Sequence, residues 1–218
     1  SKIKAKELSD YLSRSYKIKS MPYELDISSV IDVEKTIKEV LNDFGKVDCL
    51  VNNAFFTGEC DFNNFSASKF NKGMEGTINQ VISTTNLLIP ELEKTEGCVI
   101  NIASMYGMLS PDPGIYKNRK ISYLDYGIGK SAIIHYTKYA AVQLAKNNIR
   151  VNCISPGPFP NDATKTDTNF ISELEKKVPL GRVGEANEIV GSVLFLSSNY
   201  ASYITGHNLV VDGGWTIW

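Results

Sequence analysis

The sequence lacks the features that would direct a protein to a membrane or to nucleic acid. Its 218 residues contain no uninterrupted apolar run near the roughly 18 residues that a membrane-spanning helix needs. Charge of one sign is not in excess, because 23 lysines and arginines stand against 24 aspartates and glutamates. We therefore expect no nucleic-acid partner and no membrane partner. The first fifteen residues are polar and basic and have no apolar core, so we expect that they are not a signal peptide.

Cysteine and histidine are scarce, with four cysteines, two histidines and no C-x-x-C pair. That scarcity predicts the absence of a metal site. Cys49, Cys98 and Cys153 each fall inside an apolar run, where a thiol behaves as a small buried hydrophobe. Free thiols in a core are typical of a reducing compartment, and we expect a cytoplasmic protein.

Short β-branched runs alternate with helical patterns along the chain. Strands are expected at 47–52, 98–103, 149–154 and 208–211, with a weaker one at 22–26. These runs are apolar on both faces, which is typical of strands buried on both sides of a parallel sheet. Helices are expected at 3–16, 30–44, 66–92, 126–146 and 186–198. The alternation predicts an α/β fold with a doubly wound parallel sheet in three α/β/α layers.

The unit that usually opens a dinucleotide-binding fold is not found in this chain. Such a fold begins with a strand, a G-x-G-x-x-G turn and a helix, which together with the next strand take roughly 30 residues. Here the first pattern is helical, so we expect one domain over residues 1–218 that is incomplete at its N-terminus and lacks the first β-α-β unit. The stretch 127–132 formally matches G-x-G-x-x-A, but it follows a loop far down the chain and is not a phosphate turn.

Tyr126 and Lys130 are four residues apart, which places them on one face of a helix, one turn apart. A free tyrosine has a pKa of about 10. A neighbouring ammonium favours the phenolate and lowers that pKa, which makes an acid/base usable near neutral pH. Taken alone, the same pair is also compatible with two amphipathic side chains on a helix surface.

Polar residues follow the expected strands where they end. Asn53 follows the first full strand, Ser104 the second, and Pro156 with Gly157 the third. In open parallel sheets, ligands bind outside the carboxyl ends of the strands. We therefore expect these residues and the Tyr126–Lys130 pair to lie at one edge of the sheet.

Taken together and in order, these motifs resemble those of a classical short-chain dehydrogenase/reductase, a family with a Rossmann-like fold. The motifs that carry the resemblance are Asp26-Ile27, Asn52-Asn53-Ala54, Ser104, Tyr126-x-x-x-Lys130, Asn152-x-x-Ser155-Pro156-Gly157 and Val211-Asp212-Gly213-Gly214. They span nearly the whole chain.

The resemblance implies an NAD(P)-dependent oxidoreductase that interconverts a hydroxyl and a carbonyl of a small molecule by hydride transfer. Tyr126 would be the general acid/base, Lys130 would lower its pKa and bind the nicotinamide ribose, and Ser104 would hydrogen-bond the substrate oxygen. The cofactor would be NAD or NADP. The residues that the resemblance places around it are Asp26 and Ile27 at the adenine, Asn53 and Ala54 near the ribose, and Pro156, Gly157 and Phe159 at the nicotinamide.

The chain departs from the family pattern at several points. Phe55 stands where the family has glycine, and Thr77 falls where many members have an asparagine that completes a proton relay. Between Ser104 and Tyr126 lie 21 residues, more than the family usually has. This long segment is either a solvated surface loop or part of the substrate entrance. It resembles a bacterial branch linked to surface-sugar and flagellin modification, which implies a sugar or nucleotide-sugar derivative as substrate.

The sequence leaves one further function open and disfavours another. The chain is alternatively a non-catalytic relative that serves as a binding or scaffold protein. A sugar epimerase or dehydratase with the same Tyr–Lys pair is disfavoured, because the 88 residues after Lys130 are too few for the added substrate domain of that branch. The polar segment 159–178 is interpreted as a mobile substrate lid. We also expect a homo-oligomer, a tetramer or a dimer, because the helices at 66–92 and 126–146 carry apolar residues on more than one face.

Overall fold

A four-stranded parallel sheet organises the larger part of the chain. The computed structural model describes residues 2–117, 119–121 and 123–218, which divide into two units, Ser1–Gly45 and Lys46–Trp218. In the larger unit the strands β1 (Cys49–Asn52), β2 (Cys98–Ile102), β3 (Arg150–Pro156) and β4 (Asn208–Val211) lie side by side in that order. Every pairing is parallel, so all the carboxyl ends meet at one edge. The four main strand predictions are confirmed to within two residues.

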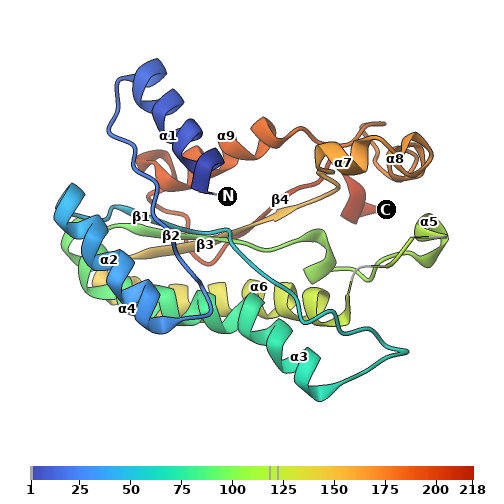
Figure 1. Ribbon diagram of the computed structural model, residues 1–218, viewed down its shortest axis with the longest axis horizontal. Helices are drawn as coiled ribbons and strands as arrows, with labels where there is room; N and C mark the ends of the chain where they lie inside the picture. The colour runs from blue at the N-terminus through green and yellow to red at the C-terminus, as the bar shows by residue number, and fades with distance from the viewer. Residues whose placement is uncertain (1, 118, 122) are drawn as a thin grey trace. The chain divides into compact units, whose positions relative to one another are not determined.

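Helices cover both faces of this sheet (Figure 1). On one face lie α3 (Ala67–Met74), α4 (Gln80–Thr95) and α6 (Leu124–Leu144), and on the other lies α9 (Ala186–Ser197). The short helices α5 (Pro113–Tyr116), α7 (Asp162–Lys165) and α8 (Thr168–Glu175) stand beyond the carboxyl ends of the strands. The prediction of three α/β/α layers is confirmed. No helix among the described residues is long and apolar enough to cross a membrane.

Neighbouring residues of β3 build two separate cores. The thiol of Cys153 packs with Val81 of α4 and Ile133 of α6, whereas Ile154 packs with Ile100 and with Leu196 of α9. Successive side chains of a strand point to opposite faces, so a strand covered on both sides is mainly apolar on both. This explains why β2 and β3 carry apolar residues on both faces instead of alternating apolar and polar ones.

The smaller unit contains the helices α1 (Lys2–Tyr16) and α2 (Val30–Phe44). Ser29 caps α2 by accepting a hydrogen bond from Asp32 N–H, and Gly45 ends it in the left-handed conformation. The strand predicted at 22–26 was wrong, because this segment is not part of the sheet. The Asp26 carboxylate instead accepts hydrogen bonds from the Ser28 N–H and hydroxyl, which forms a turn. The prediction of one domain over 1–218 stays a prediction.

The helix predicted at 66–92 differs from the expectation in two ways. It runs on to Thr95 through Pro90, because a proline removes one backbone donor without preventing the following turns. It also contains a π-helical turn at Glu75–Asn79, where Thr77 is fully buried and faces α6. Gly129 of α6 lies against it, and a Cβ at that position would come within 2.0 Å of Thr77 Oγ1. The missing side chain therefore sets how closely α6 approaches the π turn.

We expect Gly129→Ala to lower the free energy of unfolding by about 1–3 kcal/mol, because the added methyl overpacks a site with no free volume. Gly191→Ala is the matched control, since Gly191 also lies within a helix but a Cβ at that position would meet no atom within 4 Å. The free energy of unfolding of that variant should rise by about 0.5–1 kcal/mol, because alanine has a higher helix propensity than glycine. Urea unfolding of both variants checks the pair, and equal effects would contradict this view of the contact.

Candidate active site

The carboxyl end of β2 brings Ser104 next to α6. Ser104 follows the strand in an extended conformation, and its Oγ accepts a hydrogen bond from Tyr106 N–H (3.1 Å), which starts a 3-10 turn. Gly107 closes this turn against α6, where a Cβ would come within 2.7 Å of the Lys130 carbonyl carbon. The turn therefore holds the Ser104 hydroxyl close to the residues of α6 that carry the predicted chemistry.

A buried amide fixes α6 across the strands. Asn101 of β2 is fully buried, and its Oδ1 accepts a hydrogen bond from the Asn52 side chain (2.9 Å). Its Nδ2 donates to Thr137 Oγ1 (3.0 Å), and that hydroxyl donates in turn to Ile133 O. One side chain thus joins β1, β2 and α6, three residues before Ser104.

Tyr126 lies in the first turn of α6, half-buried. Burial raises the pKa of its phenol, and a hydrogen bond with Ser104 opposes that shift. The Lys130 ammonium lies 5.7 Å from the centre of the Tyr126 ring. The expectation that Lys130 lowers the pKa of Tyr126 stays a prediction.

Lys130 is only 3% exposed, and its Nζ donates a hydrogen bond to Ile102 O (2.6 Å) at the end of β2. The ammonium also lies 4.8 Å from the centre of the Phe55 ring. Burial lowers the pKa of Lys130 to about 8, since a charge is costly away from water. The side chain therefore changes protonation state close to physiological pH.

Phe55 closes the site from the side of β1. Its ring contacts Tyr126 with 5.3 Å between ring centres and lies over Lys130 as well. This ring replaces the glycine of the family pattern, so the Lys130 ammonium is partly shielded from solvent by an aromatic face. Phe55, which departs from the family pattern, thus lies against Tyr126 and Lys130, which match it.

Thr77 does not present a free proton to the site. Its Oγ1 donates a hydrogen bond to Gly73 O (2.7 Å) within its own helix. A relay through Thr77 would require this hydroxyl to give up that bond. The structure supports a site of three residues, Ser104, Tyr126 and Lys130, more directly than a relay of four.

Sequence reasoning missed Asp125, the residue before Tyr126. Its carboxylate is fully buried and accepts hydrogen bonds from Gly58 N–H (2.7 Å) and Cys60 N–H (3.1 Å). These bonds tie the segment after β1 to the first turn of α6. An acidic residue in the first turn of a helix is a recognisable signal. Its partners are backbone groups more than 60 positions away, which no local pattern reveals.

The predicted cofactor residues fall into two groups. Asn53 and Ala54 are exposed at the end of β1, and Ala54 O accepts a hydrogen bond from Gln80 Nε2 (3.0 Å). Pro156 ends β3, Gly157 N–H donates to Val211 O (2.9 Å), and Phe159 lines a cavity of about 100 Å³. Asp26 and Ile27 belong to the smaller unit, and their role at the adenine stays a prediction.

Known proteins of one family resemble this chain along most of its length. A family model described as enoyl-(acyl carrier protein) reductase matches residues 2–216. A short-chain dehydrogenase of Leptospira borgpetersenii, solved with bound NAD⁺, is 31% identical with a TM-score of 0.81 over 100% of this chain and 89% of its own. The chain belongs to the short-chain dehydrogenase/reductase family.

Other relatives show the breadth of this short-chain dehydrogenase/reductase family. A 3-oxoacyl-[acyl-carrier-protein] reductase of Chlamydia muridarum is 34% identical over 192 residues, covering 87% of this chain and 74% of the relative. A 5-keto-D-gluconate 5-reductase of Escherichia coli is 30% identical over 201 residues, covering 90% and 76%. A Mycobacterium marinum enzyme of the family has a TM-score of 0.88 at 26% identity over 100% of this chain and 84% of its own.

We expect Lys130→Met to be more stable than the natural protein at pH 7, by up to about 3 kcal/mol, and the difference to shrink towards pH 10. Below pH 8 the folded protein bears the full cost of a buried ammonium. Between pH 8 and 10.5 the unfolded chain holds a proton at Lys130 that the folded chain has released, so stability rises with pH. Urea unfolding of both proteins across this range measures the effect. A difference that does not change with pH would show that Lys130 is not buried as a charge.

Proposed function

We propose that this protein is an NAD(P)-dependent oxidoreductase that interconverts a hydroxyl and a carbonyl group of a sugar or nucleotide-sugar derivative. The observation that carries the proposal is the meeting of Ser104, Tyr126 and Lys130 at the carboxyl end of β2. The name of the Escherichia coli relative, a reductase of a keto-sugar acid, supports the class of substrate. A purely non-catalytic scaffold would not need this constellation.

The residues at this edge fit a nicotinamide dinucleotide. β1 and β3 flank β2, so the exposed Asn53 and the Pro156–Gly157 turn stand on either side of Lys130. An ammonium has three donors, and only one of them is directed to Ile102 O, which leaves two for ribose hydroxyls. The cofactor supplies or accepts the hydride when it is bound. The NAD⁺ in the Leptospira relative supports this assignment.

Tyr126 moves the proton in the proposed reaction. In reduction its phenol donates a proton to the carbonyl oxygen as negative charge develops there, and in oxidation the phenolate takes the proton back. Because burial raises its pKa, Tyr126 is protonated at neutral pH and is ready to act as the acid. Ser104 holds the same oxygen, and its hydrogen bond strengthens as the charge grows. With Tyr126 protonated, the site is ready to catalyse reduction of a carbonyl.

We expect Tyr126→Phe to lower kcat by about 10²–10⁴-fold, because it removes the phenol proton that is transferred to the substrate oxygen. The ring remains, so its contact with Phe55 and the affinity for NAD(H) or NADP(H) should change little. Steady-state kinetics of carbonyl reduction, with cofactor affinity from calorimetry, gives both values. Retention of most of the activity would rule out this mechanism.

Two matched variants separate the other roles. Lys130→Ala should weaken cofactor binding and turnover together, because it removes the charge and two donors. Ser104→Ala should mainly lower kcat, since its bond matters most when the oxygen is charged.

We further propose a cytoplasmic protein that assembles as a tetramer or a dimer. All four cysteines are free and three of them are buried, which suits a reducing compartment. On α6, the side chains of Tyr139 and Val142 are 63% and 75% exposed. Apolar surface on a long helix is typical of an interface between copies.

We expect multi-angle light scattering at micromolar concentration to give twice or four times the mass of one chain. Val142→Glu should shift the protein towards the monomer, because a charge at the centre of the apolar surface cannot be buried in an interface. The control is Val190→Glu on α9, which is 51% exposed. A monomeric mass for the unaltered protein would contradict the proposal.

A further inference from the structure

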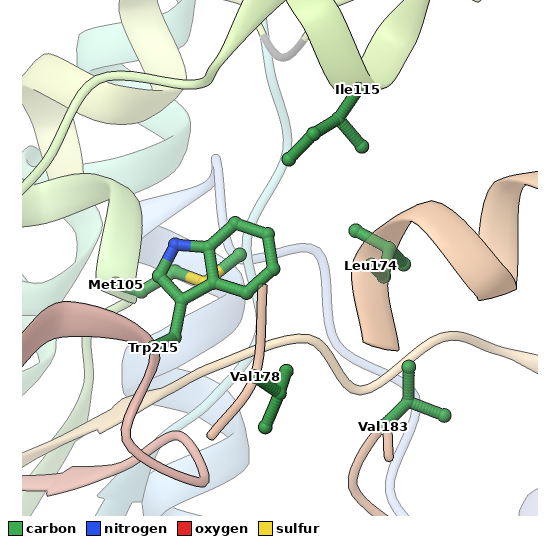
Figure 2. Packing of buried hydrophobic residues seen from close by; sticks show 6 residues of the cluster. All are labelled: Met105, Ile115, Leu174, Val178, Val183 and Trp215. Carbon is green, nitrogen blue, oxygen red and sulfur yellow. The ribbon is translucent and has the colours of Figure 1, made fainter. Parts of the chain in front are cut away.

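The long segment between Ser104 and Tyr126 is docked on α8 and is not a freely solvated loop. Ile115 of α5 and Leu174 of α8 are both about 5% exposed and belong to one apolar cluster with Trp215. Figure 2 shows the side chains of Ile115, Leu174 and Met105 around the Trp215 indole. Met105 follows Ser104 directly, so this cluster begins at the catalytic turn.

Ion pairs join the residues that flank α5 to α8 and the residues next to it. The pairs are Asp112–Lys177 (3.0 Å), Lys117–Glu173 (3.6 Å) and Arg119–Asp167 (3.4 Å). Each pair is partly exposed and contributes little to stability by itself. Their common effect is to set the register of the segment on α8, which the apolar cluster alone would leave free.

A cavity of about 480 Å³ lies between the docked segment and α8. This volume is within the usual range for small-molecule sites. Its aromatic wall consists of Tyr116 and Phe170, whose ring centres are 5.5 Å apart, and the Arg119 guanidinium lies 4.4 Å from the Phe170 ring. Asn169 and Ser172 add uncharged hydrogen-bonding groups at the rim.

The cavity is linked to the turn at Ser104 through Tyr116. Tyr116, which lines it, has its hydroxyl 2.5 Å from the Tyr106 hydroxyl, and Tyr106 N–H donates to Ser104 Oγ. Tyr116 and Tyr126 are close enough for the charge of one to disfavour ionisation of the other. Tyr116 and Tyr106 thus connect the lining of the cavity to the turn that carries Ser104.

The charges that line the cavity are paired with one another. Arg119 is bound to Asp167, and Glu173 is shared by Lys117 and Lys176. A strongly charged ligand would have to break these pairs, and an alkyl chain would cover polar groups without hydrogen-bonding them. A ring with hydroxyl groups at its edge and C–H groups on its faces can stack on the aromatic wall and bond to the rim.

We propose that the cavity between α5 and α8 binds an uncharged polyhydroxylated ring of the substrate, distal to the reacting carbonyl, with Tyr116 and Phe170 as specificity residues. This inference rests on the proposed carbonyl–hydroxyl oxidoreductase function. It assigns the long segment after Ser104 to substrate selection.

Three ketones test the proposal with NADH and NADPH. They are 4-hydroxy-2-butanone and its ethers with a glucopyranosyl or a hexyl group. The glucosyl ketone should have the highest kcat/KM. Phe170→Ala should lower that value by about threefold to tenfold, as expected for the loss of one aromatic contact, and change the other two less than twofold. Phe62→Ala, at an 86% exposed position, is the control and should change none.

A further variant and a binding measurement separate failure of the cavity assignment from failure of the proposed function. Asn169→Ala removes an exposed rim group and should raise KM for the glucosyl ketone alone, which covers the case in which Phe170→Ala does not fold. Saturation-transfer NMR with methyl β-D-glucopyranoside should show binding to the unaltered protein and none to Phe170→Ala. If the sugar binds but no ketone is reduced, the proposed function fails and the cavity assignment stands. If the ketones are reduced but Phe170→Ala affects all three equally, or the hexyl ketone is preferred, the cavity assignment is overturned.

Discussion

The buried amide of Asn101 determines where α6 lies on the sheet, and the catalytic geometry depends on that position. A buried amide must have its hydrogen bonds satisfied, so its links to Asn52 and Thr137 allow one placement of the helix along β2. Ser104 follows on the same strand, while Lys130 and Tyr126 precede Thr137 on the same helix. The carbonyl of Ile102, which lies between Asn101 and Ser104 in the sequence, then accepts a hydrogen bond from the Lys130 ammonium. Two rigid elements joined by one polar network thus bring the three groups together.

Burial alters the two titrating residues of the site in opposite directions. It raises the pKa of Tyr126 and lowers that of Lys130 to about 8, because in each case the neutral form is favoured away from water. At neutral pH the site therefore holds a phenol next to an ammonium that is close to losing its proton. The Phe55 ring offsets part of the free-energy cost of burying the ammonium, since the face of the ring attracts the charged lysine. The aromatic departure from the family pattern is in this way compatible with the retained chemistry.

The strands and the main helices could be predicted from the sequence because the strands are mostly apolar, and the central strands β2 and β3 are buried on both faces. The Tyr126–Lys130 spacing and Ser104 were likewise recognisable. The strand predicted at 22–26 was wrong because the Asp26 carboxylate accepts a hydrogen bond from Ser28 N–H and forms a turn. The apolar content of the segment does not reveal this bond. Asp125 and the docking of α5 on α8 could not be foreseen, since their partners lie about 50 to 70 positions away in the chain.

The segment between Ser104 and Tyr126 starts and ends on groups whose positions are fixed independently of it. Ser104 is held by β2 and its turn, and Tyr126 by α6 with the Asp125 contacts. The entropy of closing a loop grows only with the logarithm of its length, about 0.6 kcal/mol for each doubling. Insertions and deletions in this segment would therefore change its contacts with α8, while the distance between Ser104 and Tyr126 would stay the same. Under the proposed function, changes in this segment would alter which substrate is bound without moving Ser104, Tyr126 or Lys130.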